Sequence, residues 1–119
     1  MNILVVESRY DSSEELETLY NSFTDAEVDV GDVSDIDIEE ERENYDVVLS
    51  ELVLEDNIRG PDVLDQFEAD RKALYTVWRR DEADGYPEIQ EALDRYQVIQ
   101  KPAEYIDLEK VVREELVPQ

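Results

Sequence analysis

Three charged residues follow short apolar runs, at positions where side chains can take part in chemistry. Glu7 follows residues 3–6, Glu51 follows the run 47–49 and Ser50, and Lys101 follows residues 97–100. Apolar runs without alternation are typical of strands buried on both faces. Since the carboxyl ends of parallel strands form the edge where ligands bind, the sequence predicts two carboxylates and one ammonium in a shared hollow. Such carboxylates can pair with the ammonium or serve as ligands for Mg²⁺.

The elements that must position these residues alternate between strands and helices. Expected strands cover residues 3–6, 27–30, 47–49, 73–78 and 97–100, and expected helices cover 11–23, 61–67, 89–96 and 105–116. The acidic stretch 31–44 has an ambiguous pattern that is compatible with a short helix. Alternating strands and helices of this length predict right-handed crossovers and a parallel sheet covered on both faces. We therefore expect one three-layer α/β domain over residues 1–119, with the most apolar strands at its centre.

The composition restricts the possible functions. The 119 residues include no Cys and no His, which excludes disulfides, thiol nucleophiles and imidazole chemistry. The net charge of −23, from 34 acidic and 11 basic residues, argues against binding to nucleic acid or anionic lipid. An acidic chain with few lysines is typical of a halophile, because the screening length falls to about 3 Å in molar salt. No apolar run is long enough to span a membrane and Met1 leads almost directly into a strand, so we expect a cytoplasmic protein.

Three motifs in register with these strands resemble the receiver domain of two-component response regulators. They are Leu-Val-Val-Glu at 4–7, Tyr-Asp-Val-Val-Leu-Ser-Glu-Leu-Val-Leu-Glu-Asp at 45–56, and Val-Ile-Gln-Lys-Pro at 98–102. The resemblance covers residues 2–116. It implies a flavodoxin-like (βα)5 fold with a five-stranded parallel sheet of order 2-1-3-4-5. It also implies a stand-alone receiver, without an output domain, in phosphorelay signalling.

The resemblance also implies roles for individual residues. In the family, an acidic pair after the first strand holds Mg²⁺, and an Asp after the third accepts a phosphoryl group from a histidine kinase. A hydroxyl after the fourth strand and a Lys-Pro after the fifth bind the phosphoryl oxygens, and an aromatic residue on the fifth strand acts as a switch. Lys101 and Pro102 match the lysine position, Glu51 occupies the phosphoacceptor position, and Glu7 and Ser8 occupy the acidic pair.

Other positions depart from the family pattern. The hydroxyl position falls on Trp78, or on Thr76 if the strand register slips, and the switch position falls on Val98. Ser8 supplies no carboxylate, which leaves Glu7, Glu51 and the carbonyl of Val53 for a weak Mg²⁺ site. A longer carboxylate beneath a Trp side chain is poorly placed for in-line transfer. The departures therefore predict a degenerate receiver, not an enzyme, in which Glu51 pairs permanently with Lys101 and no cofactor is needed.

The expected partners are proteins. A histidine kinase or a downstream effector is implied by the resemblance, and a homodimer is compatible with the face formed by the fourth helix, fifth strand and fifth helix, including Tyr96 and Tyr105. Two alternatives remain: an atypical Mg²⁺-dependent phosphoacceptor, and a small metal-dependent phosphatase-like enzyme.

The cluster Trp78-Arg79-Arg80 is the one basic and aromatic group in the sequence. We expect its arginines to pair with Asp81 and Glu82, which argues against nucleic-acid stacking. Trp78 either covers the hollow or anchors a partner, since Trp is frequent at binding hot spots.

Overall fold

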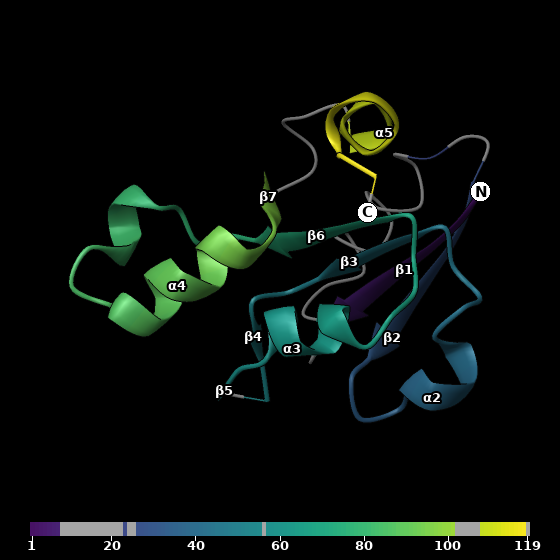
Figure 1. Cartoon of the computed structure of the whole chain (residues 1–119), viewed down its shortest axis with the longest axis horizontal. Helices are drawn as coiled ribbons and strands as arrows, with labels where there is room; N and C mark the ends of the chain where they lie inside the picture. Colours follow the sequence, from purple (N-terminus) through teal and green to yellow (C-terminus); the bar gives the residue numbers. More distant parts are fainter. Residues whose placement is uncertain (8–22, 24–25, 56, 102–107, 119) are drawn as a thin grey trace.

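A five-stranded parallel sheet forms the centre of the structure, a computed structural model that describes residues 1–7, 23, 26–55, 57–101 and 108–118. The strands are β1 (Asn2–Glu7), β2 (Glu27–Asp32), β3 (Val47–Ser50), β6 (Arg71–Thr76) and β7 (Gln97–Gln100). They lie in the order β2-β1-β3-β6-β7 and every neighbouring pair is parallel (Figure 1). This order is the flavodoxin-like topology, as predicted, with the three most apolar strands in the middle.

Helices cover both faces of this sheet, which gives the expected three layers (Figure 1). They are α2 (Ile38–Glu41), α3 (Gly60–Asp65), α4 (Pro87–Arg95) and α5 (Leu108–Lys110), which continues as the π-helical segment η3 (Val111–Glu115), together with the 3₁₀ turn η1 (Asp81–Ala83). No helix in the described part of the chain is long and apolar enough to cross a membrane. The expected helix 11–23 and the start of the expected helix 105–116 lie almost wholly outside the described residues.

Strand β1 shows why its apolar run lacks alternation. Leu4 and Val6 pack into the core cluster that contains residues of α3 and α4. Ile3 and Val5 belong to a second cluster, on the other face, that contains residues of α5 and η3. All four side chains are buried. Because both faces of the sheet are covered, successive side chains must both be apolar, and the pattern reads as a continuous run.

The structure corrects the expected bounds of the fourth strand and adds a hairpin to the expected loop before α3. The fourth strand of the sheet, β6, covers Arg71–Thr76 instead of the predicted 73–78, because Arg71 and Lys72 are already paired with β3. Trp78 therefore lies beyond the strand. The expected loop before α3 also contains a small antiparallel hairpin of β4 (Val53–Leu54) and β5 (Asn57–Ile58). Strands this short have no recognisable sequence period.

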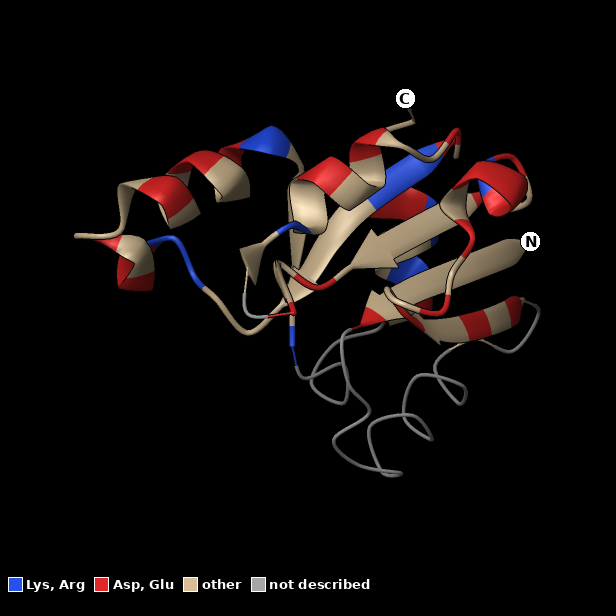
Figure 2. Cartoon of the chain, turned by 90° about the horizontal axis from the view of Figure 1, so that it is seen from below, with Lys and Arg blue, Asp and Glu red and all other residues tan. Residues whose placement is uncertain are grey.

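The charged side chains lie mostly at the surface. Figure 2 shows acidic positions along the helices and connecting segments, with few basic positions among them. Several arginines form exposed ion pairs, such as Arg42 with Glu68 at 2.7 Å. The prediction that Arg79 and Arg80 pair with the neighbouring acids is wrong. Arg80 pairs with Asp94 of α4, and Arg79 forms no ion pair with any residue that the structure describes.

Candidate functional site

The ends of β1, β3 and β7 bring three charged side chains together. Glu7 is the last residue of β1, Glu51 follows β3, and Lys101 follows β7. The backbone N–H of Glu51 donates to the carbonyl oxygen of Val6 at 3.0 Å, and that of Lys101 to the carbonyl oxygen of Thr76 at 2.9 Å. These bonds continue the ladder beyond the strands. The backbone next to each side chain is therefore held by the sheet.

Lys101 joins the two carboxylates. Its Nζ lies 2.7 Å from Oε1 of Glu7 and 2.7 Å from Oε2 of Glu51. All three side chains are nearly buried, with exposed fractions of 10% for Lys101, 12% for Glu7 and 15% for Glu51. Burial by itself lowers the pKa of Lys101, but the two carboxylates outweigh it and raise that pKa above its usual value. The ammonium is thus the charged centre of the site.

The second oxygen of Glu51 is also engaged. Oε1 accepts a hydrogen bond from the Thr76 hydroxyl at 2.6 Å and another from the backbone N–H of Leu52 at 3.1 Å. The Thr76 hydroxyl oxygen in turn accepts the N–H of Trp78 at 3.3 Å. Glu51 therefore has partners on both carboxylate oxygens. We call Glu7, Glu51, Thr76 and Lys101 the acid–lysine cluster.

Two further groups support the acid–lysine cluster and were not predicted. The ring of Tyr75, on β6, lies beneath the ammonium with its centroid 4.9 Å from Nζ of Lys101, close enough for a cation–π contact. Gly60, at the start of α3, packs against the backbone of Glu51. A Cβ at Gly60 would lie 2.3 Å from the carbonyl oxygen of Glu51, so no other residue fits without moving that backbone. A Gly before a Pro indicated only a turn in the sequence.

The structure places the hydroxyl of Thr76, and not the side chain of Trp78, against Glu51. Thr76 ends β6 and reaches Glu51, whereas Trp78 lies two residues further and its ring meets Tyr86 edge-to-face at a centroid distance of 6.0 Å. The cause is that β6 ends at Thr76, two residues before the predicted end at Trp78. This is the slip in strand register that makes Thr76 the alternative residue. Trp78 does not cover the acid–lysine cluster but borders a separate hollow with Val98.

The remaining predicted residues lie apart from the acid–lysine cluster or outside the described chain. Val98 is half-buried on β7, and Val53 is paired with Ile58 in the β4–β5 hairpin. Ser8 and Pro102 lie outside the described residues.

The described residues do not fit a Mg²⁺ ion. The ammonium of Lys101 lies 2.7 Å from Oε1 of Glu7 and 2.7 Å from Oε2 of Glu51, so a Mg²⁺ ion bound by these two oxygens would have to displace it. The described residues also include no group of three or more acidic side chains arranged to hold a metal. Since Mg²⁺ requires near-octahedral oxygen coordination, this arrangement favours the ammonium as the cation of the site.

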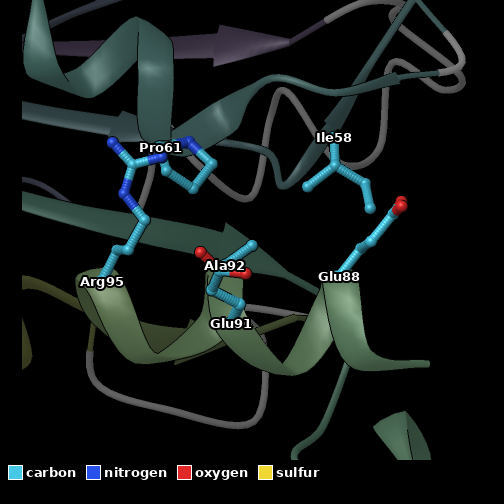
Figure 3. Close-up of a pocket in the computed structure, with 6 residues that line it drawn as sticks. All are labelled: Ile58, Pro61, Glu88, Glu91, Ala92 and Arg95. Atoms are coloured by element: carbon cyan, nitrogen blue, oxygen red, sulfur yellow. The ribbon is translucent and has the colours of Figure 1, made fainter. Parts of the chain in front are cut away.

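A groove lies elsewhere, between α4 and residues of β5 and α3 (Figure 3). Ile58, Pro61 and Ala92 supply its apolar surface, and Glu88 and Glu91 stand on the side of α4. At one end, Arg95 pairs with Asp62 at 2.9 Å and with Asp65, which ties α4 to α3. None of the acid–lysine cluster lines this groove.

Comparison with known proteins adds no assignment. No protein-family model matches the chain, and no curated protein matches it.

Proposed function

We propose that this chain is a receiver-like domain of two-component signalling that acts through protein–protein contacts without accepting a phosphoryl group. The observation that carries the proposal is the ammonium of Lys101, within 2.7 Å of Glu7 and of Glu51, at the carboxyl edge of a sheet with flavodoxin-like topology. The fold alone supports many functions. The positions of the acids and the lysine at the ends of β1, β3 and β7 are what favour the receiver family.

The hydrogen bonds of Glu51 argue against phosphoryl transfer. In-line attack needs a carboxylate oxygen that is free to approach the phosphorus atom, and its rate depends almost wholly on positioning. Lys101 holds one oxygen of Glu51, and Thr76 with the Leu52 amide holds the other. Attack by Oε1 would require breaking one of its two hydrogen bonds, and attack by Oε2 would have to proceed beside the ammonium of Lys101 within a nearly buried site. This cost is the reason we favour a fixed state over a switch.

The pairing of Glu51 with Lys101 replaces a transient interaction by a permanent one. A phosphoryl group would add negative charge and new acceptors for the lysine and the hydroxyl. Here the carboxylate of Glu51 already accepts from both Lys101 and Thr76. We therefore propose that the domain constantly presents one surface to a cytoplasmic partner, either a histidine kinase or a downstream effector. The partner can also be a second copy of this chain, bound through the face formed by α4, β7 and α5.

Incubation with acetyl phosphate and Mg²⁺, followed by intact mass measurement, tests the proposal. We expect no added phosphate on the natural chain, whereas an authentic receiver in the same buffer gains one. Glu51→Asp is the matched variant, since the shorter side chain restores the usual acceptor and releases its contacts. A gain of one phosphate by the natural chain, on Glu51 or on any nearby Asp, would instead support the atypical phosphoacceptor.

A further inference from the structure

The two edges of the sheet differ in how they are protected. Edge strand β2 carries Glu27, Asp29 and Asp32, and charged side chains are a common means of preventing strand addition. Edge strand β7 has the sequence Gln-Val-Ile-Gln, without any charge, in a chain of which 38% of residues are charged. The β7 edge thus lacks the protection by charge that β2 has.

The outer backbone groups of β7 point away from the sheet. The N–H of Lys101 donates to the carbonyl oxygen of Thr76, at 2.9 Å, which sets the phase of the β6–β7 ladder. In a parallel ladder alternate residues bond to the same neighbour, so the N–H and C=O of Val98 and Gln100 face outward. No other described segment forms a backbone hydrogen bond with Val98 or Gln100. This edge therefore offers donors and acceptors to an added strand.

A hollow of about 440 Å³ opens beside the same two residues. Val98 and Gln100 form one part of its lining, and Trp78 and Leu93 form another. Val77, next to Trp78, is 60% exposed, although it is a large apolar residue. The hollow is thus suited to an apolar side chain carried by a strand on the β7 edge, the arrangement by which strand addition gains specificity.

Arg79 gives this surface a charge preference. Its side chain is exposed, lines the hollow, and forms no ion pair with any described residue, including Asp81 of the same lining. Arg80, by contrast, is paired with Asp94. Among the described arginines, Arg71 is the other one without an ion pair to a described residue, and its Nε instead donates to the carbonyl oxygen of Leu116 at 3.3 Å. The guanidinium of Arg79 can form a bidentate pair with a carboxylate of a partner.

We propose that the β7 edge binds an extended segment of a partner protein as an added strand. An apolar side chain of that segment enters the hollow beside Trp78, and a carboxylate of the segment pairs with Arg79. The acidic residues on the rest of the surface repel an acidic partner segment, so such a segment should bind preferentially beside Arg79. This inference rests on the proposed signalling role and deepens it, because it names the surface and the chemistry of the partner.

A short Trp-free peptide of alternating Val and Thr, with a central Leu followed by Glu, tests this proposal. Trp78 is the single Trp of the chain, so its emission reports directly on the hollow. We expect saturable binding in about 0.15 M and about 1 M salt, where charges are screened beyond about 8 and 3 Å. Replacing Glu by Lys in the peptide, or N-methylating its backbone, should weaken binding about tenfold or more, as expected for the loss of one strong hydrogen bond.

Variants of the protein locate the site. Arg79→Glu should weaken the Glu peptide about tenfold and strengthen the Lys peptide, whereas Arg113→Glu, which alters an exposed arginine on η3, should change affinity less than about twofold. Val98→Pro removes an outward N–H that forms no hydrogen bond with β6. Because Val98 also packs against the core, Val98→Ala is its control, and the proline variant should weaken binding well beyond the loss that both variants share. Equal binding of the N-methylated and unmodified peptides would refute strand addition.

Two other results would also overturn the proposal. One is an unresponsive Trp78 emission at saturating peptide. The other is self-association that is lost in Val98→Pro without any peptide binding, which would show that a second copy covers the edge. Failure of the proposed function is a separate result, because a phosphate added to the chain is detected by intact mass and does not depend on the peptide.

Discussion

Lys101 and Glu51 form an ion pair 2.7 Å long across the carboxyl ends of two strands that are not neighbours in the sheet. Strand β6 lies between β3 and β7, and its last residue, Thr76, donates to the same carboxylate. The pair therefore spans three strands. The contacts of Lys101 and Glu51 depend on how the ends of these strands are aligned. Replacing either residue should therefore change both the free energy of unfolding and any function of the site.

Replacement of Lys101 by Met should be strongly destabilising. It leaves Glu7 and Glu51 nearly buried without their shared cation, and loss of one partner of a buried ion pair costs about 3–5 kcal/mol in the free energy of unfolding. Lys72→Met is the control, since Lys72 is half-buried on β6 and forms no ion pair with described residues. Urea unfolding at constant high salt measures both. A loss for Lys101→Met no larger than for the control would contradict this account of the cluster.

The hydroxyl of Thr76 should contribute more to the free energy of unfolding than the hydroxyl of an exposed residue does. Thr76→Val keeps the shape but removes the 2.6 Å bond to Glu51, and a hydrogen bond to a charged group contributes about 1.5–3 kcal/mol. Ser34→Ala removes an exposed hydroxyl that donates to Asp32 at 2.7 Å, and it should lower the free energy of unfolding much less than Thr76→Val does. Equal losses in urea unfolding would show that burial of the cluster adds nothing to this bond.

Replacing Gly60 or Gly85 by alanine should destabilise the fold, but for a different reason at each position. At Gly60 the new Cβ would lie 2.3 Å from the carbonyl oxygen of Glu51, and relieving such overlap costs about 1–3 kcal/mol. Gly85 has open space but a φ of 88°, so alanine there should cost about 1 kcal/mol through backbone strain alone. Only Gly60→Ala should also move Glu51, visible as changed backbone amide chemical shifts at Glu51 and Leu52. Unchanged shifts there would refute the positioning role of Gly60.

Alkaline pH should destabilise the protein through at least three groups in the described part of the chain. The acids around Lys101 raise its pKa despite burial, while burial and a hydrogen bond to a carboxylate raise the pKa values of Tyr45 and Tyr96. A raised pKa in the folded state contributes stability that is present below the unfolded value and is lost as pH rises through the folded value. The unfolded values are about 10.4 for Lys and about 10 for Tyr, so these contributions should stay constant from neutral pH and decline above about pH 10. Urea midpoints should follow this course, with a shallower decline in Tyr45→Phe and Tyr96→Phe; an unaltered decline in both would contradict it.

Salt should stabilise the fold. With a net charge of −23, repulsion among exposed acids opposes the compact state, and the screening length shortens from about 30 Å at 0.01 M to about 3 Å at 1 M. The melting temperature should therefore rise from dilute buffer to molar KCl. The buried Lys101 ion pairs are screened less, so Lys101→Met should remain destabilising at both concentrations. A melting temperature independent of salt would argue against a halophilic adaptation.

The sequence by itself determined which strands lie at the centre of the sheet and which at its edges, and the residues that end the first, third and fifth strands. Runs such as residues 3–6 and 47–49 identify strands covered on both faces, and the short or alternating segments identify edges. Since parallel strands place their carboxyl ends together, Glu7, Glu51 and Lys101 could be expected at one edge. These inferences need only local patterns and the rule for crossovers.

Only the tertiary structure decided which atoms meet. The exact end of β6 depends on its pairing with β3, which places the hydroxyl of Thr76 on Glu51 and leaves Trp78 beside a hollow. The same is true of Gly60 against Glu51, and of Arg79, whose neighbours in sequence are acids that it does not pair with. Such contacts join segments far apart in the chain or depend on rotamers. A shift of two residues leaves the hydrophobic pattern of a buried strand unchanged but moves every functional group at its end.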